Sequence, residues 1–417
     1  MNLKKEYSKF TKNNGFISGH WKFICLILYK IIEHIAIWFY KHSFPINKRL
    51  ILLRSMPDYS DNALALAEYL VNNGYTERYD IFFDVRDPKI FQEKDNKLPI
   101  TFFSCLNKNG QYNLRSLKLI YTAHYLMCTH TMILNSYQGR KGQHFIRLWH
   151  GCGYKDRSTH DGHSRRNFDV ALVPGPLFVK TKAYFWNVDE KYIAPIGYPR
   201  YDWLMKKDPK ALKFIQSFKE SENEKIIIWM PTFRVDKKGR YNDTQNLINF
   251  PILYNSQDWL QLDKYCKGKY VKIIIKLHPF QKAYDIPFRQ MTNIKEITND
   301  DLKIAKTQLY SFIALTDGLI TDYSSVAFDY LIVDKPIAYT LDDYKEYKEK
   351  RGFIFKDPLK YMPGHHIYTT EDLMHFVEDI SNEIDKFKSN RNEIYNIAIT
   401  PSTNYCKQIL DFLNIKK

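Results

Sequence analysis

Short apolar runs alternate with stretches of helical pattern along most of the chain. A strand-like run at Arg49–Arg54 is followed by Asp61–Asn73, where Ala and Leu recur at helical spacing, and then by a second strand-like run at Asp80–Val85. Alternation of this kind is typical of βαβ units, which build parallel sheets. Three further apolar runs extend the same predicted sheet: Leu126–Thr129, Phe145–Trp149 and Val170–Pro174. We therefore expect an α/β fold.

A polar and charged stretch at Asp208–Glu224 interrupts the alternation, which then begins again. Four predicted strands follow it: Lys225–Met230, Val271–Leu277, Gly318–Thr321 and Pro336–Thr340. Two successive α/β halves are typical of a bilobed enzyme that binds its ligand in the cleft between the lobes. We expect an N-terminal segment 1–44, a first domain 45–210, a second domain 211–390 and a C-terminal helix at 391–417.

The segment Trp21–Tyr40 is strongly apolar, but Lys30, Glu33 and His34 interrupt it. These side chains, and the long basic region before the segment, argue against a transmembrane span and a signal peptide. On a helical wheel at about 100° per residue, the polar positions fall within an arc of about 120°. They are Lys22, Lys30, Glu33, His34 and Lys41. Such an amphipathic helix can lie in a membrane interface with its lysines toward anionic headgroups, or pack against the protein itself. We favour the membrane surface.

Composition narrows the possible classes of protein. A hydrophobic content of 44% in 417 residues excludes a disordered chain and favours two domains. The formal charge of +16 suits nucleic acid, an anionic membrane face or an anionic polymer, although a genome-wide composition bias produces the same excess. No helix-turn-helix, zinc-finger or RNP signature is present, so we expect no nucleic-acid partner. Six scattered cysteines without a CxxC pair indicate free thiols in a reducing cytoplasm.

The segment Asp317–Tyr330 has the pattern of a phosphate-binding strand end. A short buried strand leads into Asp322, Ser324 and Ser325, which supply helix-capping side chains, and an apolar helix follows. The free N–H groups at such a helix start attract anions, and two hydroxyls beside them favour a phosphate. The alternative is an ordinary capped helix of an α/β domain.

Other predicted strands also end in polar side chains. His150 follows one strand and precedes two glycines, and since a histidine ordinarily titrates near neutrality, it could take a proton from an attacking hydroxyl. A purely structural histidine is the alternative. His160 and His163 with His150 and Cys152 match no zinc spacing, so we expect no metal there. The basic loop that follows, with Lys155, Arg157, Arg165 and Arg166, suits an acceptor that carries phosphates.

The strands of the second half repeat this arrangement. One ends with Thr232 and Arg234, and another ends with His278, which is followed by a proline. If these termini meet the Ser324–Ser325 helix start in one cleft, they form a plausible diphosphate site. Neither GxxxxGK[ST] nor GxGxxG is present, so a nucleoside-triphosphate P-loop and a dinucleotide fold lose support.

Several ordered blocks together resemble the CDP-glycerol glycerophosphotransferase family, whose members build teichoic acids and related capsular polymers. The resemblance runs from about Phe145 to Phe355, and the N-terminal 140 residues show no such signature. The blocks are Trp149–Gly151 with Lys155, Gly197–Asp202, Pro231–Arg234, His278–Pro279, Thr321–Ser325 with Phe328–Tyr330, and Arg351–Gly352.

The resemblance implies a GT-B-like pair of Rossmann-type domains facing a central cleft, with the acceptor on the first domain and the CDP-alcohol on the second. An acceptor hydroxyl attacks the phosphorus next to the alcohol and releases CMP. The implied catalytic residues are His150, as general base, and Lys155. The implied donor-binding residues are Thr232, Arg234, His278, Thr321, Ser324, Ser325, Asp329 and Arg351, with Asp329 accepting a ribose hydroxyl. Arg157, Arg165 and Arg166 are the acceptor-binding candidates. No acidic pair lies where a metal is needed, so we expect no metal and no other cofactor.

One departure from the family pattern concerns the substrate. Cys152 and Gly153 stand where the family often has a threonine and then a proline, so CDP-glycerol and CDP-ribitol both remain candidate donors. The acceptor is expected to be an anionic polymer or a lipid-linked precursor, and the enzyme to be cytoplasmic and peripheral on the inner face of a bacterial cell membrane. The alternatives are a GT-B glycosyltransferase that uses a nucleotide sugar, and a non-catalytic basic module that binds nucleic acid or an anionic polymer.

Overall fold

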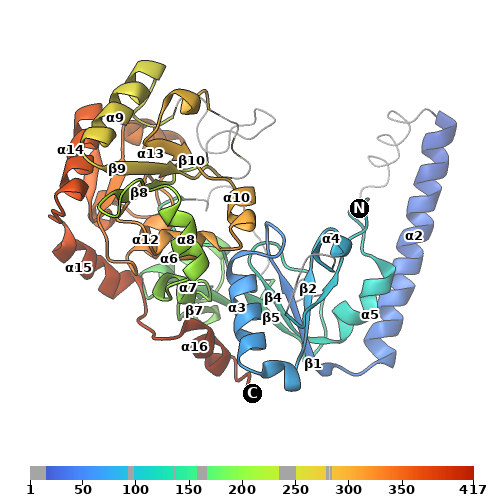
Figure 1. Cartoon of the computed structure of the whole chain (residues 1–417). Coiled ribbons are helices and arrows are strands. Elements are labelled where there is room, and N and C mark those ends of the chain that lie inside the picture. Colours follow the sequence, from blue (N-terminus) through green and yellow to red (C-terminus); the bar gives the residue numbers. More distant parts are fainter. Residues whose placement is uncertain are drawn as a thin grey trace. The chain divides into compact units, whose positions relative to one another are not determined.

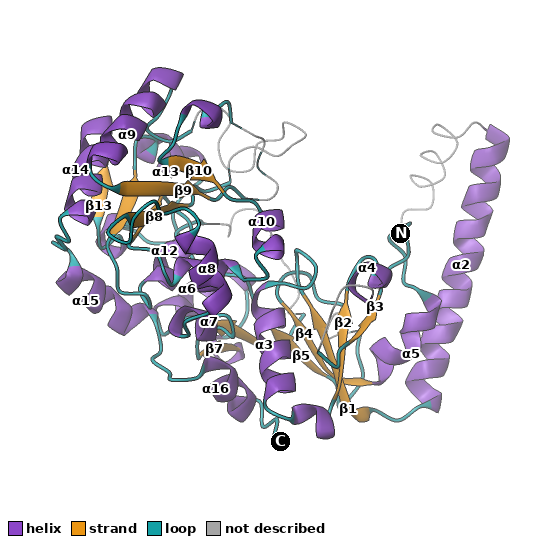
Figure 2. Cartoon of the chain, in the orientation of Figure 1, coloured by secondary structure: helices purple, strands orange, loops and turns teal. Residues whose placement is uncertain are grey.

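The computed structural model describes residues 16–92, 98–134, 138–156, 167–233, 250–278, 281 and 284–417 (Figure 1). Contacts divide the chain into two units. The first comprises Met1–Leu148, Asn167–Asp169 and Lys417, and the second comprises Trp149–Arg166 and Val170–Lys416. Helices flank parallel strands in both units (Figure 2), which is the α/β fold that the alternating pattern predicts. The domain boundaries at 44, 210 and 390 stay a prediction.

The first sheet has seven strands in the order β3-β2-β1-β4-β5-β6-β7. They are β1 (Asn47–Arg54), β2 (Asp80–Asp84), β3 (Thr101–Phe103), β4 (Ala123–Cys128), β5 (His144–Arg147), β6 (Val170–Val173) and β7 (Ile193–Pro195). β1 pairs in parallel with both β2 and β4, so the strand order reverses direction at β1. Ligands of open parallel sheets bind beyond the carboxyl ends of the strands at such a reversal. The polar residues that follow β1, β2 and β4 therefore lie where a site is expected.

The helices that belong to the first unit are α2 (Phe16–Ser43), α3 (Asp61–Asn72), α4 (Pro88–Gln92), α5 (Leu114–Thr122) and the 3-10 turn η1 (Tyr75–Glu77). Residues of β1, β4 and β5 form one apolar core with α5. Side chains of both strand faces are buried in β1 and β4, because a parallel sheet with helices on both sides has no solvent face.

Helix α2 packs beside α5 of the first unit (Figure 1). Glu33 is 4% exposed, Lys30 donates to its carboxylate at 2.8 Å, and the Tyr29 hydroxyl donates to the carbonyl of Tyr112. Three neighbours on the same side, Ala36, Ile37 and Tyr40, contact the apolar core. The opposite side carries the exposed large side chains Trp21, Leu28, Ile31, Ile32, Ile35, Trp38 and Phe39. We expected the lysines to face lipid headgroups. Lys30 instead pairs with the buried Glu33, and the contact of the lysines with headgroups stays a prediction.

The second sheet has six strands in the order β10-β9-β8-β11-β12-β13. They are β8 (Lys225–Trp229), β9 (Val271–Ile275), β10 (Ile294–Glu296), β11 (Gly318–Thr321), β12 (Ile337–Thr340) and β13 (His365–Ile367). Side chains from β8, β9, β11 and β12 form one core with helices α9 (Ser256–Gly268) and α14 (Thr370–Ser381). The central strands of this sheet are therefore covered and mostly apolar.

The remaining elements of the second unit are short. They are α6 (Leu177–Trp186), η2 (Glu190–Tyr192), α7 (Tyr201–Met205), α8 (Pro209–Gln216), η3 (Phe288–Gln290), α10 (Asn299–Ile304), α11 (Leu309–Ile313), α12 (Val326–Tyr330), α13 (Tyr344–Lys350), η4 (Leu359–Tyr361), α15 (Lys388–Ala398) and α16 (Tyr405–Phe412). The single C-terminal helix that we expected is in fact α15 and α16. Pro401 lies between them and cannot continue a helix, because it lacks the N–H group and clashes with the preceding turn. All six cysteines are free, as predicted.

Candidate functional site

The loop that carries His150 lies directly against Ser325. Gly151 has φ +139°, and a Cβ on this residue would lie 2.4 Å from Oγ of Ser325. A Cβ on Gly153 would lie 3.0 Å from the backbone nitrogen of Ser325. Only glycine allows the two backbones to approach so closely. The structure therefore brings together the predicted general base and the predicted phosphate-binding helix start, which are far apart in sequence.

A second contact holds the other end of this loop. The backbone nitrogen of Ile354 donates to the carbonyl of Tyr154 at 2.8 Å, and that of Asp156 donates to the carbonyl of Gly352 at 3.2 Å. Between them Lys155 pairs with Phe353 as an antiparallel bridge. The Arg351 guanidinium donates to the carbonyl of Asp156 at 2.8 Å. Two of the predicted site residues, Lys155 and Arg351, thus lie on adjacent segments.

Arg200 connects the His150 loop to helix α12. Its Nη1 donates to the backbone carbonyl of His150 at 3.1 Å, and its Nη2 donates to Asp329 at 2.7 Å. The guanidinium lies over the ring of Tyr310, 4.4 Å from the ring centroid. The Arg200 and Asp329 side chains are 4% and 2% exposed, so this ion pair is buried. A buried pair of this kind holds its segments firmly, because separating it leaves a charge without compensation.

Asp329 is engaged by three donors from the protein. Besides Arg200, the hydroxyls of Tyr201 and Tyr310 donate to its two carboxylate oxygens at 2.5 Å each. Burial and the carboxylate raise the pKa of Tyr201 well above its ordinary value, so this hydroxyl remains a donor. A ribose hydroxyl needs an accessible acceptor. The structure gives no support to the ribose role of Asp329, which stays a prediction, and assigns the carboxylate a structural role instead.

The strand ends of β8 and β11 are joined through Thr232 and Thr321. Both the backbone nitrogen and the hydroxyl of Thr232 donate to Asp322, the former at 2.9 Å. The hydroxyl of Thr321 donates to the carbonyl of Met230 at 2.7 Å. Both hydroxyls therefore bond to the protein itself in this conformation. Ser324 and Ser325 differ from them, since both are half-buried and the side chain of Ser325 does not cap α12.

His278 follows β9, is exposed, and stacks on Phe233 with 4.9 Å between ring centroids. The buried Lys276 lies two residues before it and donates to the carbonyl of Leu277 at 2.9 Å. Burial lowers the pKa of Lys276 to about 8. Phe233 and His278 thus stack at this strand end, two residues after the buried Lys276.

Four predicted site residues lie outside the described ranges: Arg157, Arg165, Arg166 and Arg234. Their roles stay predictions. Among the residues that the structure describes, no group of three or more His, Cys, Asp or Glu side chains is arranged to hold a metal ion. The expectation of a metal-independent reaction is not tested by this finding.

Sequence reasoning missed the roles of Arg200, Tyr201 and Tyr310. The first two belong to the Gly197–Asp202 block, so the block itself was a usable signal. Tyr310 carries no local signal, because its role depends on a contact with a residue 19 positions away. The carboxylate of Asp202, in the same block, accepts hydrogen bonds from the backbone nitrogens of Tyr405 and Cys406 at 2.7 and 3.1 Å. It therefore caps the start of α16.

Comparison with known proteins identifies the family. The sequence model of the family described as CDP-Glycerol:Poly(glycerophosphate) glycerophosphotransferase matches residues 36–399. The chain belongs to this family. The match begins far before Phe145, so residues 36–140, in which no motif stands out, also belong to the family's common sequence.

Individual relatives in this family are teichoic acid enzymes. The chain is 28% identical over 261 residues to a teichoic acid ribitol-phosphate primase of Bacillus spizizenii, covering 57% of this chain and 61% of the relative. It is 26% identical to the teichoic acid glycerol-phosphate primase of Bacillus subtilis, covering 76% of this chain and 80% of that protein. It is 27% identical to a teichoic acid glycerol-phosphate transferase of Staphylococcus aureus, covering 88% and 93%. The chain spans only 40% and 44% of the length of two ribitol-phosphate polymerases that it also matches.

Solved structures of the wall teichoic acid polymerase TagF share the fold of this family member. One of them aligns with a TM-score of 0.71 at 18% identity, covering 99% of this chain and 97% of that chain. At this identity the likeness concerns the fold alone.

The close approach at Gly151 can be tested by adding one carbon. We expect Gly151→Ala to lower the free energy of unfolding by about 2 kcal/mol, because the new Cβ overlaps Ser325 and the backbone is strained. Chemical denaturation measures this. Gly110→Ala is the matched control, since Gly110 also has positive φ but a Cβ there has no neighbour within 4 Å. If the overlap is the cause, Gly151→Ala costs less in a Ser325→Gly background. An equal cost in both backgrounds contradicts the contact.

The buried pair can be tested with Asp329→Asn. This change leaves Arg200 buried without a counter-charge, and we expect a loss of about 3 kcal/mol in the free energy of unfolding. Tyr310→Phe removes one hydrogen bond and is expected to cost about 1 kcal/mol. Denaturant unfolding measures each loss. Together with Arg200→Gln and the double variant Arg200→Gln/Asp329→Asn, it gives the coupling energy between Arg200 and Asp329. Additive losses would show that Arg200 and Asp329 do not act as a pair.

Proposed function

We propose that this chain transfers a polyol phosphate, glycerol phosphate or ribitol phosphate, from a CDP-alcohol to a hydroxyl of a membrane-linked teichoic acid or capsular polymer. The other product is CMP. The observation that carries the proposal is the contact between the His150 loop and Ser325 in a chain whose sequence matches the glycerophosphotransferase family over residues 36–399. It puts a proton acceptor beside a candidate phosphate-binding segment.

In the proposed reaction His150 takes the proton of the attacking acceptor hydroxyl. The new bond forms between that oxygen and the phosphorus attached to the alcohol, and the bond from this phosphorus to the CMP oxygen breaks. CMP leaves with the electron pair of that bond. Proton transfer to a positioned histidine lowers the barrier, and hydrogen-bond donors stabilise the charge that develops on the leaving phosphate. Ser324, Ser325, His278 and Arg351 are the candidate donors for this charge.

Arg200 has a supporting role in this proposal. Its hydrogen bond to the carbonyl of His150 fixes the backbone of the base, and its pair with Asp329 fixes Arg200 in turn. Catalytic groups must be held within a fraction of an ångström, so such support matters for the rate. We further propose that the two sheets belong to GT-B-like lobes with a central cleft, and that Arg157, Arg165 and Arg166 attract the anionic acceptor.

The first test measures donor choice and the base together. With a lipid-linked acceptor, we expect nucleotide release from CDP-glycerol or CDP-ribitol and none from UDP-sugars. In His150→Ala the rate of CMP release is expected to fall by a factor of about 10² or more, because general-base catalysis is lost. His375→Ala, which changes an exposed histidine of α14, is the control and keeps the wild-type rate. Full activity of His150→Ala contradicts the base assignment. Release of UDP from a nucleotide sugar, with none of CMP, points to a glycosyltransferase.

We propose a location on the cytoplasmic face of the membrane, and helix α2 supports the association with a membrane. By length and composition alone, His20–Ser43 is long and apolar enough to cross a membrane, with a mean hydropathy of 1.7. Its packed side holds Lys30 and the buried Glu33, whereas its exposed side is apolar, including Trp21, Ile35 and Trp38 at 64%, 63% and 61% exposure. An exposed apolar helix face of this kind needs a cover. We propose that α2 lies in the plane of the membrane interface with this face in the lipid.

The membrane proposal is tested on the exposed face alone, because deleting the whole helix also removes packed side chains. We expect the variant Trp21→Gln/Leu28→Gln/Ile35→Gln/Trp38→Gln to move from the membrane fraction to the soluble fraction. Thermal unfolding of this variant should match the wild type, since the four side chains are exposed. The control replaces the exposed Tyr254, Ile304 and Phe412 by Gln and should stay on the membrane. Equal membrane binding of both variants overturns the proposal.

A further inference from the structure

A polar pocket of about 390 Å³ lies in the first unit. Its lining comes from the residues at and after the carboxyl ends of β1, β2, β3 and β4. The strand order reverses between β2, β1 and β4, so the pocket occupies the point where open parallel sheets bind ligands. Its volume lies in the range of ordinary small-ligand sites.

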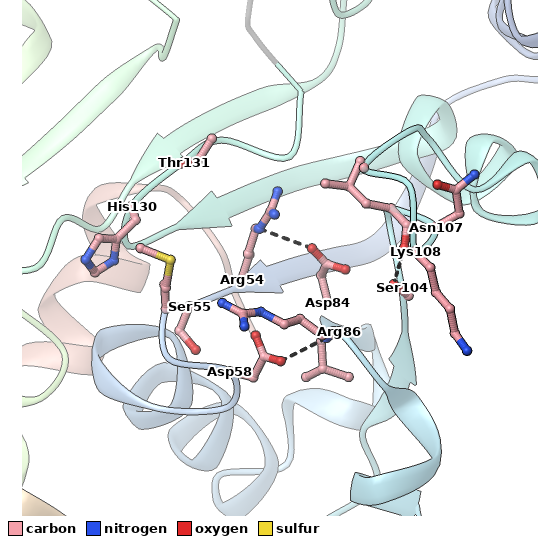
Figure 3. Close-up of a pocket in the computed structure, with 14 residues that line it drawn as sticks. Arg54, Ser55, Asp58, Asp84, Arg86, Ser104, Asn107, Lys108, His130 and Thr131 are labelled. Carbon is pink, nitrogen blue, oxygen red and sulfur yellow. Dashed lines mark hydrogen bonds and ion pairs between the residues drawn. The ribbon is translucent and has the colours of Figure 1, made fainter. Parts of the chain in front are cut away.

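Charged side chains of both signs meet in this pocket. Figure 3 shows Arg54, Arg86, Asp58 and Asp84 gathered at its centre. On the two sides of this group, Figure 3 shows His130 and Thr131, and Asn107 and Lys108. The side chains come from four loops that the sheet topology brings together, so their proximity does not follow from their positions in sequence.

The cations of the pocket have free hydrogen-bond donors. Nε of Arg54 lies 3.2 Å from Asp84, and in the part of the chain that the structure describes its two terminal nitrogens have no partner. Arg86 donates its backbone nitrogen to Asp58 at 2.9 Å, and no described residue pairs with its guanidinium. Lys108 is exposed and likewise has no partner among the described residues. Two forked guanidinium groups and an ammonium group match the oxygens of a phosphate.

The carboxylates make a bare phosphate a poor match. Asp84 is buried, holds Arg54 and accepts the backbone nitrogen of Cys105 at 2.7 Å. Burial raises the pKa of Asp84, and Arg54 opposes that shift. Asp58 keeps one oxygen that accepts no hydrogen bond from the described residues. Carboxylates repel an isolated anion but accept hydrogen bonds from hydroxyls. A ligand that carries both a phosphate and several hydroxyls satisfies both sets of groups.

We propose that this pocket binds one polyol-phosphate unit of the acceptor chain. Arg54, Arg86 and Lys108 hold its phosphodiester, Asp58 accepts a hydroxyl, and Asp84 orients Arg54. This inference rests on the proposed function, because it assumes that the acceptor is a polyol-phosphate polymer. It adds a candidate binding site built from residues of the first unit.

The experiment uses the full chain and a soluble trimer of glycerol phosphate as the probe. Arg86→Gln/Lys108→Gln removes two cations that pair with no described carboxylate, so folding should be unaffected. We expect calorimetric affinity for the trimer to fall at least about 10-fold, as for two lost charge-assisted contacts. The steady-state KM for the acceptor should rise, while the KM for the CDP-alcohol and kcat at saturating acceptor stay unchanged. Lys206→Gln/Lys207→Gln changes the net charge equally at exposed positions of the second unit and should keep wild-type affinity.

A second variant tests the carboxylates. Asp58→Asn keeps an oxygen for the backbone nitrogen of Arg86 but removes the charge. We expect weaker binding of the trimer and tighter binding of inorganic phosphate, because the repulsion disappears together with a strong hydroxyl acceptor. An unchanged trimer affinity in Arg86→Gln/Lys108→Gln overturns the pocket, and so does an equal loss in the Lys206/Lys207 control.

A lipid headgroup carries the same phosphate and hydroxyl groups as the polymer unit. Binding to phosphatidylglycerol vesicles distinguishes these two possible ligands. If Arg86→Gln/Lys108→Gln loses vesicle binding but keeps trimer binding, the pocket belongs to a lipid headgroup and the proposal is wrong. Failure of the pocket leaves CMP release from the CDP-alcohol intact. Failure of the proposed function instead appears as absence of CMP release in the wild-type chain.

Discussion

The buried ion pair between Arg200 and Asp329 is the interaction on which the arrangement of the candidate site depends. It joins residues that are 129 positions apart, and the same guanidinium holds the backbone of His150. Two charges in a dry interior are tolerated only when they are paired and hydrogen-bonded, and the two tyrosine hydroxyls complete the shell of Asp329. The three segments therefore have to come together in one geometry, because any separation exposes an uncompensated charge to an apolar surrounding.

A steric condition acts together with this electrostatic one. The glycines after His150 leave room for Ser325, and the short ladder between the loop and residues 352–354 ties down its far end. The loop that carries His150, the proposed base, is therefore held at both ends by backbone contacts. This arrangement explains why blocks that are scattered over two hundred residues occur together in one family. They specify the contacts between segments as much as the chemistry.

The two units contribute different surfaces. The second unit holds the His150 loop, Ser325 and the Arg200 pair, and so we assign it the donor and the proton transfer. The first unit carries α2, with its apolar face turned outward, and the pocket around Arg54. We propose that this unit meets the membrane and the acceptor. An acceptor anchored in lipid has to be bound near the membrane surface, so a lipid-facing helix and an acceptor pocket on the same unit form a consistent pair of features.

The sequence by itself determined the α/β class, the nine longer strands to within a few residues and the family. These depend on local patterns, namely continuous apolar runs and short ordered blocks, which need no knowledge of distant neighbours. The sequence did not predict the strands β3, β7, β10 and β13, because each has three residues, which are too few to show a hydrophobic period. Only the tertiary structure decided which side of α2 is packed, since an amphipathic pattern does not say what covers each face. It also decided the environment of Asp329 and the existence of the Arg54 pocket, because both arise from side chains that the sheet topology brings together from distant positions.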